Sequence, residues 1–345
     1  MVAVPLVPVS RIRLSNAKAE DGGGADGEQD DDLVALRAES EAFYHRSVMP
    51  EEVMAALKPG PGRWFFDGTV GGGGHTEDIL RSGGNVIGCD QDTDAIAYAS
   101  ERLKGYGDRV RLVHANFSDL DRILSDAGHP QVDGILLDLG ISSFQIDAPG
   151  RGFSFMRPGP LDMRMNPEGA ETAADLVNYA EPAELARIFR EYGEEPAAQR
   201  IVQAVLHARE NSLITTTAEL AAIVESVIPR TSGRHPATRI FQALRIAVND
   251  ELRRLTEALE KSAGCLNSGG VLAVISFHSL EDRIVKRFMR EHSEKTIDRP
   301  EWPNPKPNPN RYFELLRRKP LEPEEDEVSD NPRARSAKLR VAVRI

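Results

Sequence analysis

The feature that most constrains this chain is a run of glycines directly behind a short hydrophobic segment. Residues 67–75 read Asp-Gly-Thr-Val-Gly-Gly-Gly-Gly-His, and they follow Trp-Phe-Phe at 64–66. Glycine supplies positive φ and lets backbone N–H groups approach a ligand without an intervening Cβ. Asp90 ends a second hydrophobic run, about 20 residues beyond the loop, where an acid can accept hydrogen bonds from ribose hydroxyls. Together these features predict an enzyme that binds a nucleotide-like cofactor. A flexible glycine linker is the alternative, but the two flanking hydrophobic segments that end in acids disfavour it.

The kind of cofactor follows from what the loop lacks. The dinucleotide fingerprint Gly-x-Gly-x-x-Gly fits no frame, because the third glycine would fall on Thr76 or Glu77. Asp67 would also repel a pyrophosphate at the start of the following helix. An acid there suits a cation without phosphate, and S-adenosylmethionine carries an ammonium, a sulfonium and two ribose hydroxyls. The loop therefore predicts a methyltransferase and argues against a dehydrogenase.

Composition is that of a soluble globular protein, with 40% hydrophobic and 28% charged residues in a chain of 345. No segment approaches 18 consecutive apolar residues, and the N-terminus makes a poor signal peptide, so we expect a cytoplasmic protein without membrane association. Cys89 and Cys265 are too widely spaced for a metal motif or a disulfide framework, and no metal is expected.

The net charge of −11 is unevenly distributed along the chain. Acids dominate residues 1–42 and 321–330, and the remainder is close to neutral. Within that remainder, bases gather in three clusters, at 283–290, 311–319 and 333–344. Such clusters could contact phosphates, although for any single cluster a solvated helix face is the commoner explanation.

Hydrophobic patterning divides the chain into three parts. Residues 1–42 are acidic and glycine-rich and predict a disordered extension. Short strands alternating with helices predict a parallel sheet covered on both faces, with its binding site at the carboxyl ends of the strands. These strands are expected at 63–66, 85–89, 110–114, 132–137 and 270–275, with an edge strand at 338–345.

Strand signals are missing from about 150 to 250, where helical patterns take over. Thr216 and Glu219 form a capping-box pattern, and Pro236 is expected to open one long amphipathic helix that runs as far as Leu259. We therefore predict an α/β fold, a Rossmann-like class I methyltransferase sheet in 43–148 and 246–345, with an all-helical insertion at 149–245. The insertion is the natural piece for recognising the substrate.

Six stretches of the sequence share their residues with one family. They are the loop at 67–75, the segment 133–143, the pair 151–156 and 159–165, the pair 235–239 and 241–243, the segment 276–288, and Asn-Pro-Arg-Ala-Arg-Ser at 331–336. On these stretches the chain, from about residue 44 to its C-terminus, resembles the MraW-type bacterial methyltransferases. That family methylates the N4 amino group of a cytosine in small-subunit ribosomal RNA, and it also carries a helical insertion.

The resemblance implies a set of contacts with S-adenosylmethionine. The methionine portion would be held by Gly73, Gly74 and His75; the ribose by Asp90; the adenine by Phe117; and the region of the transferred methyl group by Asp138 and Gln145. Phe144 stands where the family often has proline, which could alter the loop that carries Gln145.

The sequence offers two sets of candidates for the group that assists the transfer. Many amino-methyltransferases use an Asp/Ser/Asn-Pro-Pro-Tyr/Phe motif, which is missing here, and Asp138-Leu139-Gly140 lies in the corresponding place. Asp138 is therefore the first candidate acceptor for the amino group, and Ser276 and His278 are the second. No cysteine is placed to attack the ring, which argues against carbon methylation through a covalent adduct.

The expected partner is 16S ribosomal RNA or the assembled small ribosomal subunit, with a homodimer as a possible assembly. Residues 151–165 mix arginines with aromatic residues as RNA-contacting surfaces do, or else they pack as a connection between the domains. Two other functions stay open at this point: a methyltransferase with a non-RNA substrate, and an adenosine-binding module without catalysis.

Overall fold

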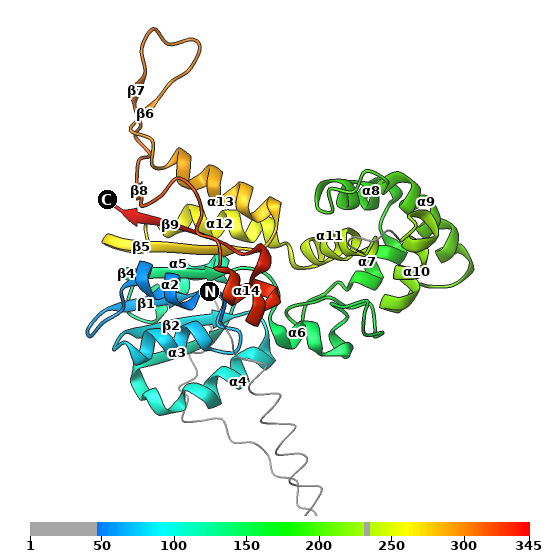
Figure 1. The fold of residues 1–345 in the computed structure, drawn as a ribbon, viewed down its shortest axis with the longest axis horizontal. Helices are drawn as coiled ribbons and strands as arrows, with labels where there is room; N and C mark the ends of the chain where they lie inside the picture. Colours follow the sequence, from blue (N-terminus) through cyan, green and yellow to red (C-terminus); the bar gives the residue numbers. More distant parts are fainter. Residues whose placement is uncertain (1–46, 231–234) are drawn as a thin grey trace, which may run out of the picture. The chain divides into compact units, whose positions relative to one another are not determined.

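The computed structural model describes residues 47–230 and 235–345 (Figure 1). The predicted acidic extension at 1–42 lies outside the described residues. Two compact units make up the described chain: one contains the residues up to Leu139 together with Ala258–Ile345, and the other is Gly140–Glu257. The sequence-based boundaries at 148/149 and 245/246 both fall inside the second unit. Assignment of the second unit to substrate recognition stays a prediction.

The first unit is built on one seven-stranded sheet in the order β3-β2-β1-β4-β5-β9-β8 (Figure 1). The strands β1 to β5 are parallel, and β9 runs antiparallel to both β5 and β8. This confirms the predicted Rossmann-like α/β sheet. The bounds are β1 Trp64–Asp67, β2 Asn85–Asp90, β3 Val110–His114, β4 Val132–Asp138, β5 Leu266–Ser276, β8 Phe313–Leu315 and β9 Lys338–Arg344.

The strand order reverses between β1 and β4. From β1 the chain moves outward to β2, whereas β4 is paired on its other side with β5, so the connections leaving these two neighbours diverge. In open parallel sheets, ligands bind where the order reverses in this way. The loops after Asp67 and Asp138 therefore meet at the edge where a cofactor is expected.

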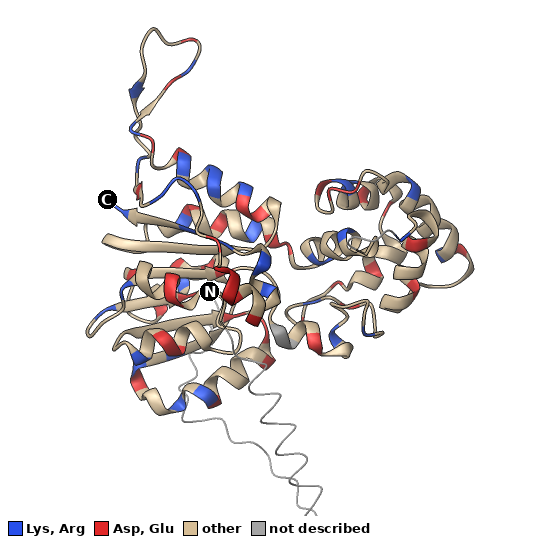
Figure 2. Cartoon of the chain, in the orientation of Figure 1, with Lys and Arg blue, Asp and Glu red and all other residues tan. Residues whose placement is uncertain are grey.

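Helices accompany this sheet, and the strands are buried as parallel strands covered on two faces must be. Phe65, Phe66, Ile135 and Leu136 are fully buried. The α-helices are α2 Pro50–Leu57, α3 Gly74–Arg81, α4 Thr93–Leu103, α5 Leu120–Asp126, α13 Ser279–Glu291 and α14 Glu325–Asp330; the 3-10 turns are η2 Lys104–Arg109, η3 Phe117–Asp119 and η5 Pro332–Ser336. A separate small hairpin pairs β6 Thr296–Ile297 with β7 Lys306–Pro307, and lysines and arginines gather on α13 just before it (Figure 2).

The second unit is helical and has its own hydrophobic core, which includes Phe189, Ile201, Val205 and Leu244. Thr216 and Glu219 form the expected capping box. The elements are α6 Ser143–Asp147, η4 Pro149–Arg151, α7 Ala173–Tyr179, α8 Pro182–Glu191, α9 Ala198–Asn211, α10 Thr217–Val227 and α11 Ala237–Asn249.

The prediction of a single long helix from Pro236 to Leu259 is wrong. The chain forms two helices, α11 and then α12 (Glu251–Ser262), separated by Asp250. Asp250 has φ 53° and ψ 37°, a left-handed conformation that no residue inside an α-helix adopts. The hydrophobic spacing continued across the break, so periodicity alone could not reveal it.

Within the described residues, no helix has the length and hydropathy needed to cross a lipid bilayer.

Replacing Gly134 by alanine should destabilise the first unit. A Cβ at this position of β4 would lie 2.8 Å from the ring of Phe65 and 2.9 Å from the side chain of Leu57, both of them fully buried. Overpacking of this kind costs about 1–3 kcal/mol of unfolding free energy, which urea denaturation measures. The matched control is Gly60→Ala, where a Cβ meets nothing within 4 Å. Equal midpoints for the two variants would contradict the packing explanation.

Candidate active site

The glycine loop between β1 and α3 is shaped by its own backbone. Gly71 and Gly73 have φ of 50° and 81°, which a side chain would disfavour. The N–H of Gly73 donates to the carbonyl of Val70 at 2.7 Å, and α3 begins at the next residue. The first N–H groups of α3, at Gly74 and His75, have no carbonyl partner within the helix and are free to face a ligand.

Asp67 organises this loop from inside. Its side chain is 1% exposed, and its carboxylate accepts hydrogen bonds from the N–H of Thr69 at 3.1 Å and the hydroxyl of Thr76 at 2.6 Å. Burial raises the pKa of Asp67, and the hydrogen bond from Thr76 works in the opposite direction. The carboxylate therefore fixes the two ends of the loop and adds negative charge beneath it.

Asp90 ends β2 and is tied to the same loop. One carboxylate oxygen accepts from the N–H of Gly71 at 2.8 Å, and the other accepts from the N–H of Asp92 at 2.9 Å. Burial raises the pKa of Asp90 to about 6, against the effect of these two backbone donors. Each oxygen keeps a second lone pair, so the carboxylate can still accept hydrogen bonds from the two hydroxyls of a ribose.

Phe117 lies on the other side of the loop, at the start of η3. Its Cβ lies 2.8 Å from the place that a Cβ on Gly68 would occupy, and the side chain of Leu137 lies 2.5 Å from it. Only glycine fits at position 68. Phe117 is partly exposed beside the loop, as a ring that stacks on a base must be.

His75 and Asp138 meet at the end of β4. The Nε2 atom of His75 lies 3.6 Å from a carboxylate oxygen of Asp138, and His75 is 6% exposed. Burial alone would lower the pKa of His75, but the Asp138 carboxylate and then Asp67 outweigh it and raise the pKa overall. Both ring nitrogens of His75 and Oδ1 of Asp138 are buried without a hydrogen-bond partner among the described residues. Buried polar atoms rarely stay unpaired, so this cluster fits a polar ligand.

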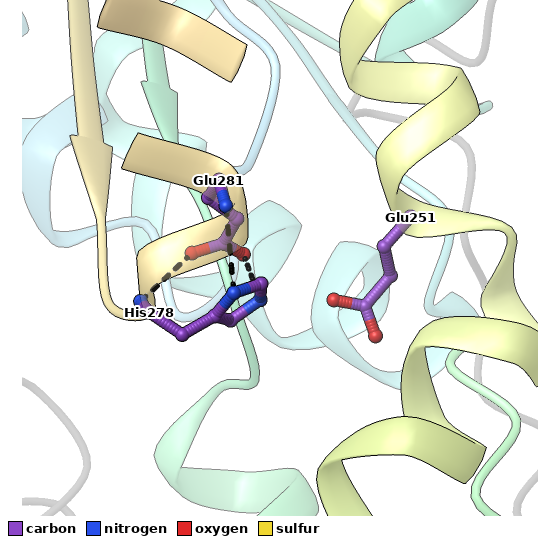
Figure 3. A group of neighbouring side chains, drawn as sticks. All are labelled: Glu251, His278 and Glu281. Carbon is purple, nitrogen blue, oxygen red and sulfur yellow. Dashed lines mark hydrogen bonds and ion pairs between the residues drawn. The ribbon is translucent and has the colours of Figure 1, made fainter. Parts of the chain in front are cut away.

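Ser276 and His278 have structural contacts of their own. Ser276 is 2% exposed, and its hydroxyl donates to the carbonyl of Lys338 on β9 at 3.5 Å. His278 caps α13: its Nδ1 accepts from the N–H of Glu281 at 3.4 Å, and its Nε2 lies 3.1 Å from the Glu281 carboxylate (Figure 3). That carboxylate also accepts from the N–H of Phe277 at 2.9 Å. These contacts give both residues a structural role, although Nε2 of His278 is buried without a hydrogen-bond partner among the described residues. The catalytic role of both residues stays a prediction.

Gln145 belongs to the second unit, on α6, where it is buried and exchanges hydrogen bonds with Ser142. Its part in closing the cofactor pocket stays a prediction, as do the cofactor contacts assigned to Gly73, Gly74, His75, Asp90, Phe117 and Asp138.

The segment 151–165 is largely packed within the second unit. Arg151 donates to the carbonyls of Arg164 and Met165 at 3.1 and 2.9 Å, and Arg164 is paired with Asp162 at 2.7 Å. The ring of Phe155 stacks on His235 with centroids 4.3 Å apart. These contacts favour the packing interpretation of the segment over an RNA-contacting surface for most of its arginines and aromatics.

Comparison with known proteins assigns the chain to a family. The model of the MraW methylase family matches residues 42–345. The chain belongs to the MraW methylase family. It is 51% identical over 311 residues to the ribosomal RNA small subunit methyltransferase H of Syntrophotalea carbinolica, covering 88% of this chain and 99% of that protein. Proteins of the same name from Anaeromyxobacter sp. and Geobacter sulfurreducens are 50% and 48% identical, each over 88% of this chain and 98% and 99% of their own length. A solved rRNA methylase from Streptococcus thermophilus covers 86% of this chain and 94% of its own at 11% identity, with a TM-score of only 0.40.

Membership of this family makes the chain an S-adenosylmethionine-dependent methyltransferase, as the loop predicted.

Two residues that the sequence did not single out hold the site together. The hydroxyl of Thr69 accepts from the N–H of Asp138 at 2.7 Å, so the glycine loop is joined to the end of β4. Arg102 on α4 donates to the carbonyl of Gly72 at 2.9 Å and to the Glu77 carboxylate at 2.8 Å. Arg102 lies 30 residues beyond the loop, where no local signal connects them.

The affinity for S-adenosylmethionine should fall below about pH 6. Hydrogen bonds from ribose hydroxyls require the ionised form of Asp90, whose pKa is about 6. With that pKa, only about a tenth of the protein is ionised at Asp90 at pH 5, so the Kd should rise about tenfold from pH 7.5. Titration calorimetry at both pH values measures it. In Asp90→Asn the Kd should be weaker and should lose the part of this rise that comes from Asp90, leaving the part due to His75, whose pKa is also raised; the same tenfold rise in that variant would remove Asp90 as the cause.

Replacing Arg102 by alanine should weaken cofactor binding without unfolding the protein. The loop would lose its link to α4 and would have to be ordered by the ligand, at about 1–2 kcal/mol per residue, so we expect a Kd about tenfold weaker. Arg81→Ala is the matched control, because Arg81 pairs with the same Glu77 at 2.7 Å but is 64% exposed. An equal effect in both variants would point to Glu77 rather than to the loop.

Proposed function

We propose that this chain transfers the methyl group of S-adenosylmethionine to the N4 amino group of a cytosine in 16S ribosomal RNA. The observation that carries the proposal is the identity of about half of the residues with proteins named ribosomal RNA small subunit methyltransferase H, over 88% of this chain. That span includes both units. We further propose that the protein is located in the cytoplasm. We also propose that it assembles as a homodimer, which light scattering on the purified protein tests.

The residues around the loop fit the cofactor. Asp67, Asp90 and Asp138 surround the loop with negative charge, which suits a ligand that carries a sulfonium and an ammonium. Asp90 would accept hydrogen bonds from the ribose hydroxyls, and the N–H groups of Gly74 and His75 at the start of α3 would face the methionine carboxylate. Phe117 would cover one face of the adenine.

Asp138 would assist the transfer. When bound, S-adenosylmethionine supplies an electrophilic methyl group on its sulfonium. The amino nitrogen of cytosine is a poor nucleophile because its lone pair is conjugated with the ring. The unpaired Oδ1 of Asp138 can accept a hydrogen bond from that amino group, and this hydrogen bond localises the lone pair on the nitrogen. After methyl transfer, the same carboxylate can receive the proton that the nitrogen loses. Nε2 of His75 lies 3.6 Å from the other oxygen of this carboxylate, Oδ2. The target base must leave its stack to reach this edge of the sheet.

The proposal is tested by methyl transfer from tritiated S-adenosylmethionine to small ribosomal subunits that lack this modification. We expect label in N4-methylcytidine after nucleoside digestion and mass spectrometry. Cofactor binding without label in RNA would discard the RNA substrate and leave a methyltransferase for proteins or small molecules. Label in another nucleoside would keep the RNA and discard the cytosine.

Replacing Asp138 by alanine should abolish turnover by removing the acceptor for the amino group. A loss of about 100-fold or more in kcat is expected for a proton-accepting group, with the same assay as readout. Asp133→Asn is the control on the same strand, since Asp133 lies near the opposite end of β4 and accepts from the N–H of Trp64 at 3.0 Å. Near-normal kcat in Asp138→Ala would remove this residue from the mechanism.

A further inference from the structure

Four basic side chains form a stripe along one face of α13. Arg283, Lys286, Arg287 and Arg290 are all exposed, and their spacing of three, four and seven residues places them on one side of a helix. The opposite side is buried through Val285, Phe288 and Met289 among others. Figure 2 shows the basic residues gathered on this helix.

Two arginines of the stripe are only weakly neutralised by acids. Arg287 and Arg290 lie 3.8 and 3.9 Å from Glu291 and Glu294, farther than a hydrogen bond, and both arginines are more than half exposed at 69% and 60%. Exposed pairs of this kind contribute little to stability. No ion pair of Lys286 is found among the described residues. Phosphates could therefore displace the acids at small cost.

The stripe continues into an arm that projects beyond α13 (Figure 1). The arm is residues 292–312 and contains the β6–β7 hairpin. Its base is anchored by Asn308, which is 9% exposed and donates to the carbonyls of Glu291 and Glu294 at 2.8 and 2.9 Å at the end of α13. His292 stacks on Tyr312, with ring centroids 5.4 Å apart, and closes the base. The arm thus leaves the helix in a defined direction.

The arm brings two further cations together on an aromatic ring. Arg299 and Lys306 lie 5.0 and 4.5 Å from the ring centroid of Trp302. Arginine, lysine and aromatic side chains in one exposed place form the usual surface for a nucleic-acid strand. Residues 283–319 contain eleven Lys and Arg against five Asp and Glu, a formal net charge of +6 in a chain whose total is −11.

We propose that the α13 stripe and the arm form a docking surface for the phosphate backbone of the RNA strand that flanks the target base. This deepens, and rests on, the proposed function. The surface begins beside the site, because α13 starts three residues after β5 ends, at the edge of the sheet where Asp138 lies. At 1.5 Å per residue the stripe begins about 6 Å along α13 from that edge and runs about 10 Å further, towards the arm. An otherwise acidic chain needs such a local surface to hold RNA against general repulsion.

The test compares RNA affinity and its salt dependence in a variant without the stripe. Arg283→Gln, Lys286→Gln, Arg287→Gln and Arg290→Gln are combined, and the probes are isolated small subunits and a single-stranded 16S fragment that contains the target cytosine. The slope of log K against log salt concentration is negative, and loss of four phosphate contacts on a single strand should reduce its magnitude by about 2–3. The KM for subunits should rise at least tenfold, with the kcat at saturation and the Kd for S-adenosylmethionine unchanged.

Two controls separate charge and position from general damage. Lys104→Gln with Arg122→Gln removes exposed bases, 62% and 47% exposed, elsewhere in the same unit and should leave the slope and KM as in the unmodified protein. Arginine-to-lysine replacements at 283, 287 and 290 keep the charge and should restore most of the affinity. If the quadruple variant does not fold, Lys286→Gln alone should still lower the slope by about 0.7.

The outcomes distinguish this inference from the proposed function. Normal methylation by the unmodified protein, with an unchanged slope and KM in the stripe variants, overturns the docking surface alone. A loss in the Lys104/Arg122 control that is half as large as in the stripe variant also overturns it, because four charges are removed in one and two in the other, and only net charge would then matter. If the unmodified protein neither binds nor methylates the subunit, the proposed function fails and the docking surface fails with it.

Discussion

The site depends on the close approach of the glycine loop to the end of β4. Gly68 donates its N–H to the carbonyl of Leu136 at 3.0 Å, and the side chain of Leu137 leaves no room for a Cβ there. Thr69 then accepts the N–H of Asp138 at 2.7 Å. The loop proposed to carry the cofactor contacts is therefore joined by two hydrogen bonds to the end of β4, which carries the carboxylate proposed to meet the substrate. A change at the end of β1 or of β4 would therefore move both the glycine loop and the Asp138 carboxylate.

The same approach has an electrostatic consequence. Asp67, Asp90 and Asp138 lie around one loop, and the pKa values of Asp67 and Asp90 are raised because burial disfavours their charge. Backbone N–H groups and Thr76 recover part of that loss through hydrogen bonds, whereas Oδ1 of Asp138 has no such partner among the described residues. A cationic ligand would relieve the remaining repulsion. The cluster is thus organised for a sulfonium rather than for a phosphate.

The sequence predicted the sheet and the loop because their signals are local. Hydrophobic runs that end in acids gave β1, β2 and β4 to within a residue, and the glycines marked the turn between β1 and α3. It missed the break at Asp250, since a left-handed residue interrupts a helix without interrupting the hydrophobic spacing. Thr69 and Arg102 were also missed, because their partners at Asp138 and Gly72 lie far away in the sequence. Arginines at 151 and 164, read as possible RNA contacts, turn out to hold carbonyls and an acid within their own unit.

The engagement of Arg151 and Arg164 within their own unit bears on which surface can bind RNA. Arg151 and Arg164 are engaged by well-formed hydrogen bonds, and exchanging these for phosphates would leave backbone carbonyls and Asp162 without partners, at about 1–3 kcal/mol each. Arg287 and Arg290 on α13 differ because their acids lie 3.8 and 3.9 Å away, beyond hydrogen-bond distance, in exposed pairs. A basic side chain can bind a phosphate at low cost only where it does not already make strong hydrogen bonds within the fold. By this criterion the surface of α13 is better suited to bind RNA phosphates than the segment 151–165, whose mixture of arginines and aromatic residues first suggested RNA contact.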